Sequence, residues 1–123
     1  MGRTVELRKT VKEELSRVCD GVYYLKAPSD ALYPYITYEL KSTNIDGFKV
    51  YQLEVYINSN LEDTSILEDL GDLLEREFNE TMVTTIDHIL SFSINVRNTP
   101  MESDKNIMKL RMLIDISYYE RRT

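Results

Sequence analysis

The fold is decided by residues 48–79, which read FKVYQLEVYINSNLEDTSILEDLGDLLEREFN. In the first part of this stretch apolar and polar residues alternate, which is the two-residue repeat of a strand with one buried face. The apolar side of this strand carries Tyr51, Leu53, Val55 and Ile57. In the second part the repeat becomes helical, and one apolar stripe contains Ile66, Leu67, Leu70, Leu73, Leu74 and Phe78. A strand and a helix with one apolar face each predict a helix packed on a sheet.

The chain before this stretch predicts a helix and further strands. Residues Thr4–Cys19 carry apolar positions at helical spacing, and Val22–Leu25 is a short run of strand-forming residues. The runs Pro34–Thr43 and Phe48–Asn58 flank the turn-forming pair Asp46-Gly47. These two runs are therefore expected to form a hairpin.

The chain after this stretch predicts two more strands. One run places Leu90, Phe92, Ile94 and Val96 on a single side, and a second, from Met108 to Tyr118, alternates in the same way. These two runs are expected to form a second hairpin, and the polar segment between them, Asn98–Asn106, is expected to be a mobile loop. We therefore expect a single α+β domain spanning residues 1–123, with a mostly antiparallel sheet of about four to five strands and two helices packed on one face.

Composition limits the function classes. The chain has 123 residues and a net charge of −6, so binding to nucleic acid through phosphate neutralisation is not the first expectation. The single cysteine, Cys19, excludes an internal disulfide and suits a reducing compartment. The longest apolar runs fall well short of the roughly 20 residues that span a bilayer. These features predict a soluble, cytoplasmic protein without a membrane partner.

The sequence offers little material for catalysis. His88 is the single histidine and only Asp87 adjoins it, so we expect a structural role rather than a metal site. Cys19 lies near the end of an apolar helix face and is expected to be a small buried residue. The acids of the second helix are explained as its solvent face. We expect no catalytic residue, no metal and no cofactor, and hence no enzyme.

Tyrosines and outward apolar residues suggest a protein interface. The chain has nine tyrosines and no tryptophan, and tyrosine combines a rigid apolar ring with a polar tip. Four apolar residues fall on the side of their strands opposite the expected core, which predicts that a partner covers this side. These candidate subunit-interface residues are Tyr56, Ile89, Leu113 and Tyr119.

One segment resembles a known family. The order Val22-Tyr23-Tyr24, Ala27-Pro28 and Leu32-Tyr33-Pro34-Tyr35-Ile36-Thr37-Tyr38 is similar to that of small tail-completion proteins of tailed phages and prophages. In that family a helix, a short strand and a proline-containing loop precede a strand that begins Pro-Tyr-x-x-Tyr, and Pro34, Tyr35 and Tyr38 occupy those places here. The later order of a long strand, an acidic helix and two strands also agrees.

The resemblance implies a tail-terminator or head–tail joining subunit. Such proteins are non-enzymatic, assemble in the bacterial cytoplasm into hexameric rings, and become part of the virion tail. They contact tail-tube and head-connector proteins, and DNA passes through the ring without sequence-specific binding. The residues alone leave two alternatives open, a small acidic adaptor or immunity-type inhibitor that binds one protein, and a hydrolase that uses the helix acids.

Overall fold

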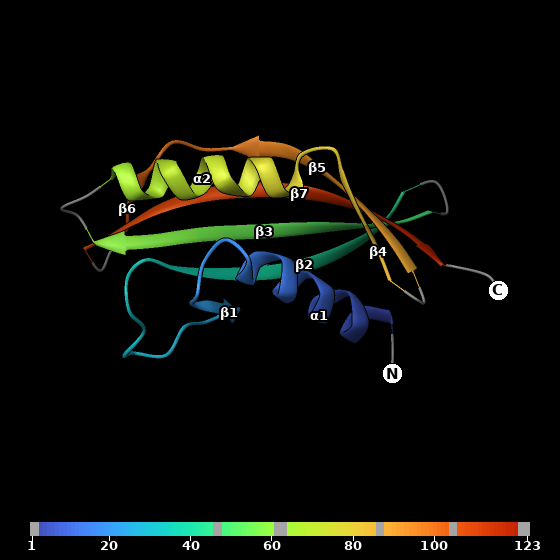
Figure 1. Ribbon diagram of the computed structural model, residues 1–123, viewed down its shortest axis with the longest axis horizontal. Helices are drawn as coiled ribbons and strands as arrows, with labels where there is room; N and C mark the ends of the chain where they lie inside the picture. Colours follow the sequence, from blue (N-terminus) through green and yellow to red (C-terminus); the bar gives the residue numbers. More distant parts are fainter. Residues whose placement is uncertain (1–2, 46–47, 61–63, 86–87, 104–105, 121–123) are drawn as a thin grey trace.

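The computed structural model describes residues 3–45, 48–60, 64–85, 88–103 and 106–120 (Figure 1). Within these residues the chain forms two helices and seven strands, which is the α+β class expected from the sequence. In chain order the elements are α1 (Arg3–Ser16), β1 (Val22–Tyr24), β2 (Tyr35–Ile45), β3 (Phe48–Asn60), α2 (Ser65–Phe78), β4 (Thr81–Thr84), β5 (His88–Arg97), β6 (Met101–Glu102) and β7 (Ile107–Glu120).

The strands form one mixed sheet in the order β1-β2-β3-β7-β5-β4, with β6 paired to β7. The hairpin of β2 and β3 and the antiparallel pairing of β5 with β7 confirm the two expected strand pairs. The Asp46-Gly47 turn lies outside the described residues. The expected count of four to five strands was too low because β4 and β6 are too short to show a repeat. In addition, β1 pairs parallel to β2, so the sheet is mixed.

The buried apolar residues of the strands and of both helices form one hydrophobic core cluster. In Figure 1, α2 runs along β7 and β5, while α1 lies beside β2 and runs in the opposite direction. The largest fully buried side chains are Leu7, Leu15, Ile36, Tyr51, Leu53, Ile57, Leu67, Leu74, Phe78, Leu90, Phe92 and Leu110. These residues bury enough apolar surface to make the hydrophobic effect the main stabilising force.

The stripe of α2 is narrower than the sequence predicted. Its buried positions are Leu67, Gly71, Leu74 and Phe78, at spacings of four, three and four residues. Leu73 lies off this line, and its exposed fraction is 41%. The prediction that Leu73 belongs to the core was therefore wrong, because a helix of 3.6 residues per turn cannot bury two adjacent leucines equally.

A bulge in β5 changes which side its last residues face. Ile94 pairs with Ile114, but the next paired residue is Val96, opposite Leu113, and Arg97 pairs with Met112. One extra residue reverses the inward and outward positions that follow it. The prediction that Val96 shares the core side was wrong, since Val96 lies on the side of Leu113. Arg97 instead reaches α2, where a Cβ added to Gly71 would lie 2.8 Å from its guanidinium.

The segment between β5 and β7 is less irregular than expected. Met101 and Glu102 form β6, which pairs with Lys109 and Met108 at the start of β7. The backbone N–H of Ser103 also donates to the carbonyl of Ile107, at 2.7 Å. The expected mobile loop thus contains a short strand that continues the line of β5.

Candidate functional site

The four candidate interface residues all lie on the outer face, defined here as the side of the sheet opposite the helix-packed core residues. Across β3 and β7, Tyr56 pairs with Arg111, and Leu113 pairs with both Glu54 and Val96. At the other end of the sheet, Ile89 pairs directly with Tyr119, whose exposed fraction is 56%. The structure therefore places these residues as two separate pairs on the sheet, Tyr56 with Leu113 and Ile89 with Tyr119, rather than as one cluster.

An ionic network occupies the middle of the outer face. Glu54 is only 8% exposed, and one of its carboxylate oxygens accepts from Arg111 Nε at 2.9 Å and lies 2.8 Å from Nη2. Lys41 Nζ lies 3.7 Å from the other carboxylate oxygen. The hydrogen bonds to Glu54 raise the pKa of Arg111, which keeps the guanidinium charged.

Polar groups also flank the apolar residues of this face. Lys109 Nζ lies 5.3 Å from the ring centre of Tyr56, a cation–π contact. Asp115 accepts hydrogen bonds from Gln52 at 3.3 Å and from Asn95 at 2.9 Å. The outer face can therefore offer a partner a few apolar side chains within a frame of fixed charges and amides. The alternation of β3 and β7 predicted the apolar residues, but the position of Val96 depends on the bulge.

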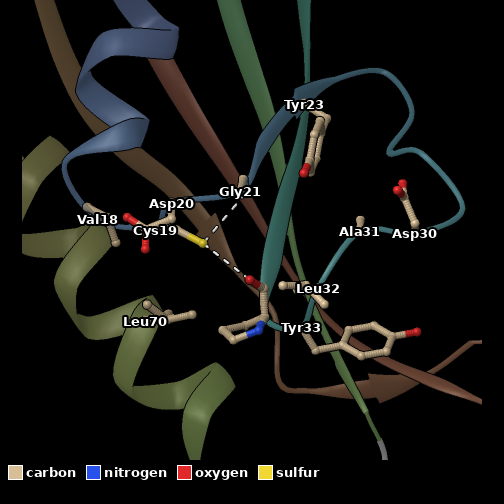
Figure 2. Close-up of a pocket in the computed structure, with 11 residues that line it drawn as sticks. Val18, Cys19, Asp20, Gly21, Tyr23, Asp30, Ala31, Leu32, Tyr33 and Leu70 are labelled. Atoms are coloured by element: carbon tan, nitrogen blue, oxygen red, sulfur yellow. Dashed lines mark hydrogen bonds between the residues drawn. The ribbon is translucent and has the colours of Figure 1, made fainter.

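An open pocket of about 690 Å³ lies where the end of α1, the loop before β2 and α2 meet (Figure 2). Its lining includes apolar Leu32, Tyr33 and Leu70, together with the carboxylates of Asp20 and Asp30. Cys19 lies at its wall, and its Sγ is within hydrogen-bonding distance of two carbonyl oxygens, that of Gly21 at 3.6 Å and that of Pro34 at 3.5 Å (Figure 2). Burial raises the pKa of the Cys19 thiol, so the sulfur stays protonated and is a poor nucleophile.

His88 is buried within the fold. Its Nε2 lies 3.4 Å from the hydroxyl of Thr10 in α1, and its ring lies 5.3 Å from that of Tyr118. The neighbouring Asp87 lies outside the described residues. Among the described residues, no three His, Cys, Asp or Glu side chains gather closely enough to hold a metal ion. The position of His88 links α1 to the sheet.

A pair of carboxyl groups joins the two helices. Glu14 of α1 is only 7% exposed and hydrogen-bonds Glu77 of α2. Burial and this hydrogen bond raise the pKa of Glu14 to about 7, although the nearby Arg17 opposes the shift. Arg17 lies 3.7 Å from Glu14 and 3.9 Å from Glu77. The contact of these two carboxyl groups, with Arg17 beside them, joins α1 to α2, and it was not predicted from the sequence.

Comparison with known proteins gives a likeness of fold. No protein-family model matches the sequence, and no curated protein matches it. A solved structure described as the virion of a native gene transfer agent particle contains a chain that superposes with a TM-score of 0.61. The match covers 87% of this chain and 84% of that chain, at 9% sequence identity. Within the described residues, no helix is long and apolar enough to cross a membrane.

Proposed function

We propose that the chain is a structural subunit of a phage or prophage tail, a tail terminator or head–tail joining protein that forms a ring at the end of the tail tube. The observation that carries this proposal is the fold, which a virion chain of a gene transfer agent shares over 87% of the present chain. The particle in question is a virion, so the likeness favours a part in virion assembly over the other functions considered.

The Pro-Tyr-x-x-Tyr segment supports the proposal from the sequence side. Tyr38 is buried in β2 and packs edge-on against Tyr24 of β1, with ring centres 5.3 Å apart. Tyr35 begins β2 and stacks on Tyr33 at 5.5 Å. The motif thus holds the loop before β2 and the edge strand β1 together, which gives its residues a structural role that a non-enzymatic subunit requires.

In this proposal the protein assembles in the bacterial cytoplasm, becomes part of the virion tail, and contacts tail-tube and head-connector proteins. DNA passes through the hexameric ring without base-specific contacts, which suits a chain with a net charge of −6. No cofactor and no catalytic residue are needed. The outer face, with Tyr56, Ile89, Leu113 and Tyr119, is the proposed surface for contacts between subunits.

The test is self-association of variants on the outer face. Tyr56→Asp and Leu113→Asp should reduce assembly, measured by light scattering at concentrations where the wild type assembles, because each places a charge beside the Glu54–Arg111 pair. Circular dichroism checks that both variants stay folded. If both variants assemble normally, the outer face does not form the contact between subunits. A wild type that stays monomeric, alone and with tail-tube protein, would favour the adaptor or inhibitor instead.

A further inference from the structure

The charges of α1 are divided between its two flanks. At about 100° per residue, Arg8 and Lys12 lie on the flank opposite Glu6 and Glu14, while Lys9 and Glu13 lie next to each other between the two flanks. One contact fixes the direction in which each flank points. The Arg8 guanidinium lies 4.6 Å from the ring centre of Tyr24 in the edge strand β1, whereas Glu14 bonds Glu77 of α2. The basic flank, defined as Arg8 and Lys12 with Lys9 at its border, therefore lies on the side of α1 away from α2.

The far side of α2 has the opposite charge. The same helical geometry places Glu68, Asp72 and Glu75 together, and Arg97 of β5 contacts the carboxylates of Asp72 and Glu75 and the backbone of Glu68. Arg97 Nη1 donates to Asp72 and to Glu75, each at 2.8 Å, and Nη2 donates to the Glu68 carbonyl at 3.2 Å. One guanidinium among three carboxylates leaves this acidic flank, defined as Glu68, Asp72 and Glu75, with excess negative charge.

The two flanks lie at opposite margins of the helix layer. The sheet order places β1, which α1 contacts, at one edge, while α2 contacts β3, β5 and β7 towards the other (Figure 1). Along the helix axis, Arg8 to Lys12 spans about 6 Å of α1 and Glu68 to Glu75 spans about 10.5 Å of α2. One copy of the chain therefore carries two separate, short surfaces that are opposite in charge.

We propose that the basic flank of one copy packs along the acidic flank of the next copy. Such a contact joins two different surfaces of the same chain, and a head-to-tail contact of this kind closes into a ring when its rotation closes. The occupant is a second copy, because the chain itself supplies the complementary charge. This inference rests on the proposed ring and names the surfaces that build it, in addition to the outer face.

Charge reversal on each flank tests the pairing. Lys9→Glu with Lys12→Glu gives a chain with two acidic flanks, and Glu68→Lys with Asp72→Lys gives a chain with two basic flanks. Glu75 remains to hold Arg97 in the second variant. Each variant alone should associate at least about tenfold more weakly than the wild type in sedimentation velocity, since like charges then meet. An equimolar mixture of the two should assemble again, with the copies alternating.

Three controls make the result specific. Lys26→Glu reverses a charge outside both flanks, so this variant should assemble as the wild type does. Circular dichroism checks folding, and restored assembly in the mixture excludes misfolding directly. Wild-type association should also weaken with added salt, because the Debye length falls from about 10 Å at 0.1 M to about 3 Å at 1 M.

The outcomes separate this inference from the proposed function. If the wild type assembles and both reversed variants assemble equally well, or if their mixture does not assemble, the flanks are not the contact and the ring proposal still stands. If the wild type stays monomeric, alone and with tail-tube protein, the ring and the flank contact both fail.

Discussion

Glu54 and Val55 are neighbours in β3, and their surroundings show how differently the two faces of the sheet are built. Val55 is fully buried among apolar side chains, whereas Glu54 is nearly buried among Arg111, Lys41 and the other polar groups of the outer face. The helix-covered face is stabilised by apolar burial, which does not depend on direction. The outer face depends on particular partners and contributes less to stability, so it is better suited to recognition.

The sharpest way to test the covered face is to compare two adjacent leucines of α2. Leu74 is fully buried, while Leu73 is 41% exposed. Leu74→Ala should lower the free energy of unfolding by about 2–5 kcal/mol, as should Leu53→Ala in β3, because each leaves a cavity. Leu73→Ala should cost less than about 1 kcal/mol. Urea denaturation measures all three, and equal losses for Leu73 and Leu74 would contradict the assigned face of α2.

The contact between Glu14 and Glu77 places a titratable carboxyl group between the two helices. The raised pKa of Glu14, about 7, means that the folded state holds its proton more tightly than the unfolded chain does. The free energy of unfolding should therefore fall as the pH rises from about 4.5 to about 7. Glu14→Gln keeps a hydrogen-bonding group without the charge, and should be more stable than the wild type at pH 8 by on the order of 1–3 kcal/mol.

The control is to compare the two proteins at a pH where Glu14 is protonated. At pH 4.5 and below the protonated wild type and Glu14→Gln should have similar stability, so the difference between them should grow with pH. Thermal unfolding across this range measures it. A constant difference from pH 4.5 to pH 8 would rule out titration of Glu14 as the cause.

A smaller effect is expected from the ionic network of the outer face. Glu54→Ala removes the partner of Arg111, whose side chain is 35% exposed and can regain water. The free energy of unfolding should fall by about 1 kcal/mol, well below the loss for a buried leucine. Paired denaturation curves of Glu54→Ala and Arg111→Ala, with the double variant, give the coupling between the two side chains. Zero coupling would show that the network does not hold this face together.

The smallest expected effect concerns Gly71 beneath the Arg97 side chain. An alanine there favours the helix by about 1 kcal/mol, but its Cβ would lie 2.8 Å from the guanidinium of Arg97. Gly71→Ala should therefore be nearly neutral in the wild type. In an Arg97→Ala background the same change should stabilise by about 1 kcal/mol. Equal effects in both backgrounds would show that Arg97 does not constrain this position.

Much of the fold could be predicted because its main strands are long and alternate regularly. The two strand pairs, both helices and the core residues of β3 follow from simple repeats in the sequence. The parallel pairing of β1 could not be predicted, since three residues carry no information about direction. The extra residue in β5 was also hidden, because Val96 continues the apolar alternation although it faces the other side.

The candidate site was less predictable for the same physical reason. Alternation placed Tyr56 and Leu113 on the outer face, but it could not show that Glu54 and Arg111 pair between them. Arg97 neutralises part of the charge of the acidic flank of α2, and it reaches the helix only because of the bulge. Surfaces built from side chains on several elements depend on register, and register is set by the whole sheet.

Sedimentation equilibrium of the wild-type chain, alone and with tail-tube protein, tests the central proposal most directly. We expect a closed assembly with the mass of six chains, which weakens when the flanks or the outer face are altered and re-forms when the two flank variants are mixed. A wild-type chain that remains monomeric at high concentration and in the presence of tail-tube protein would contradict it.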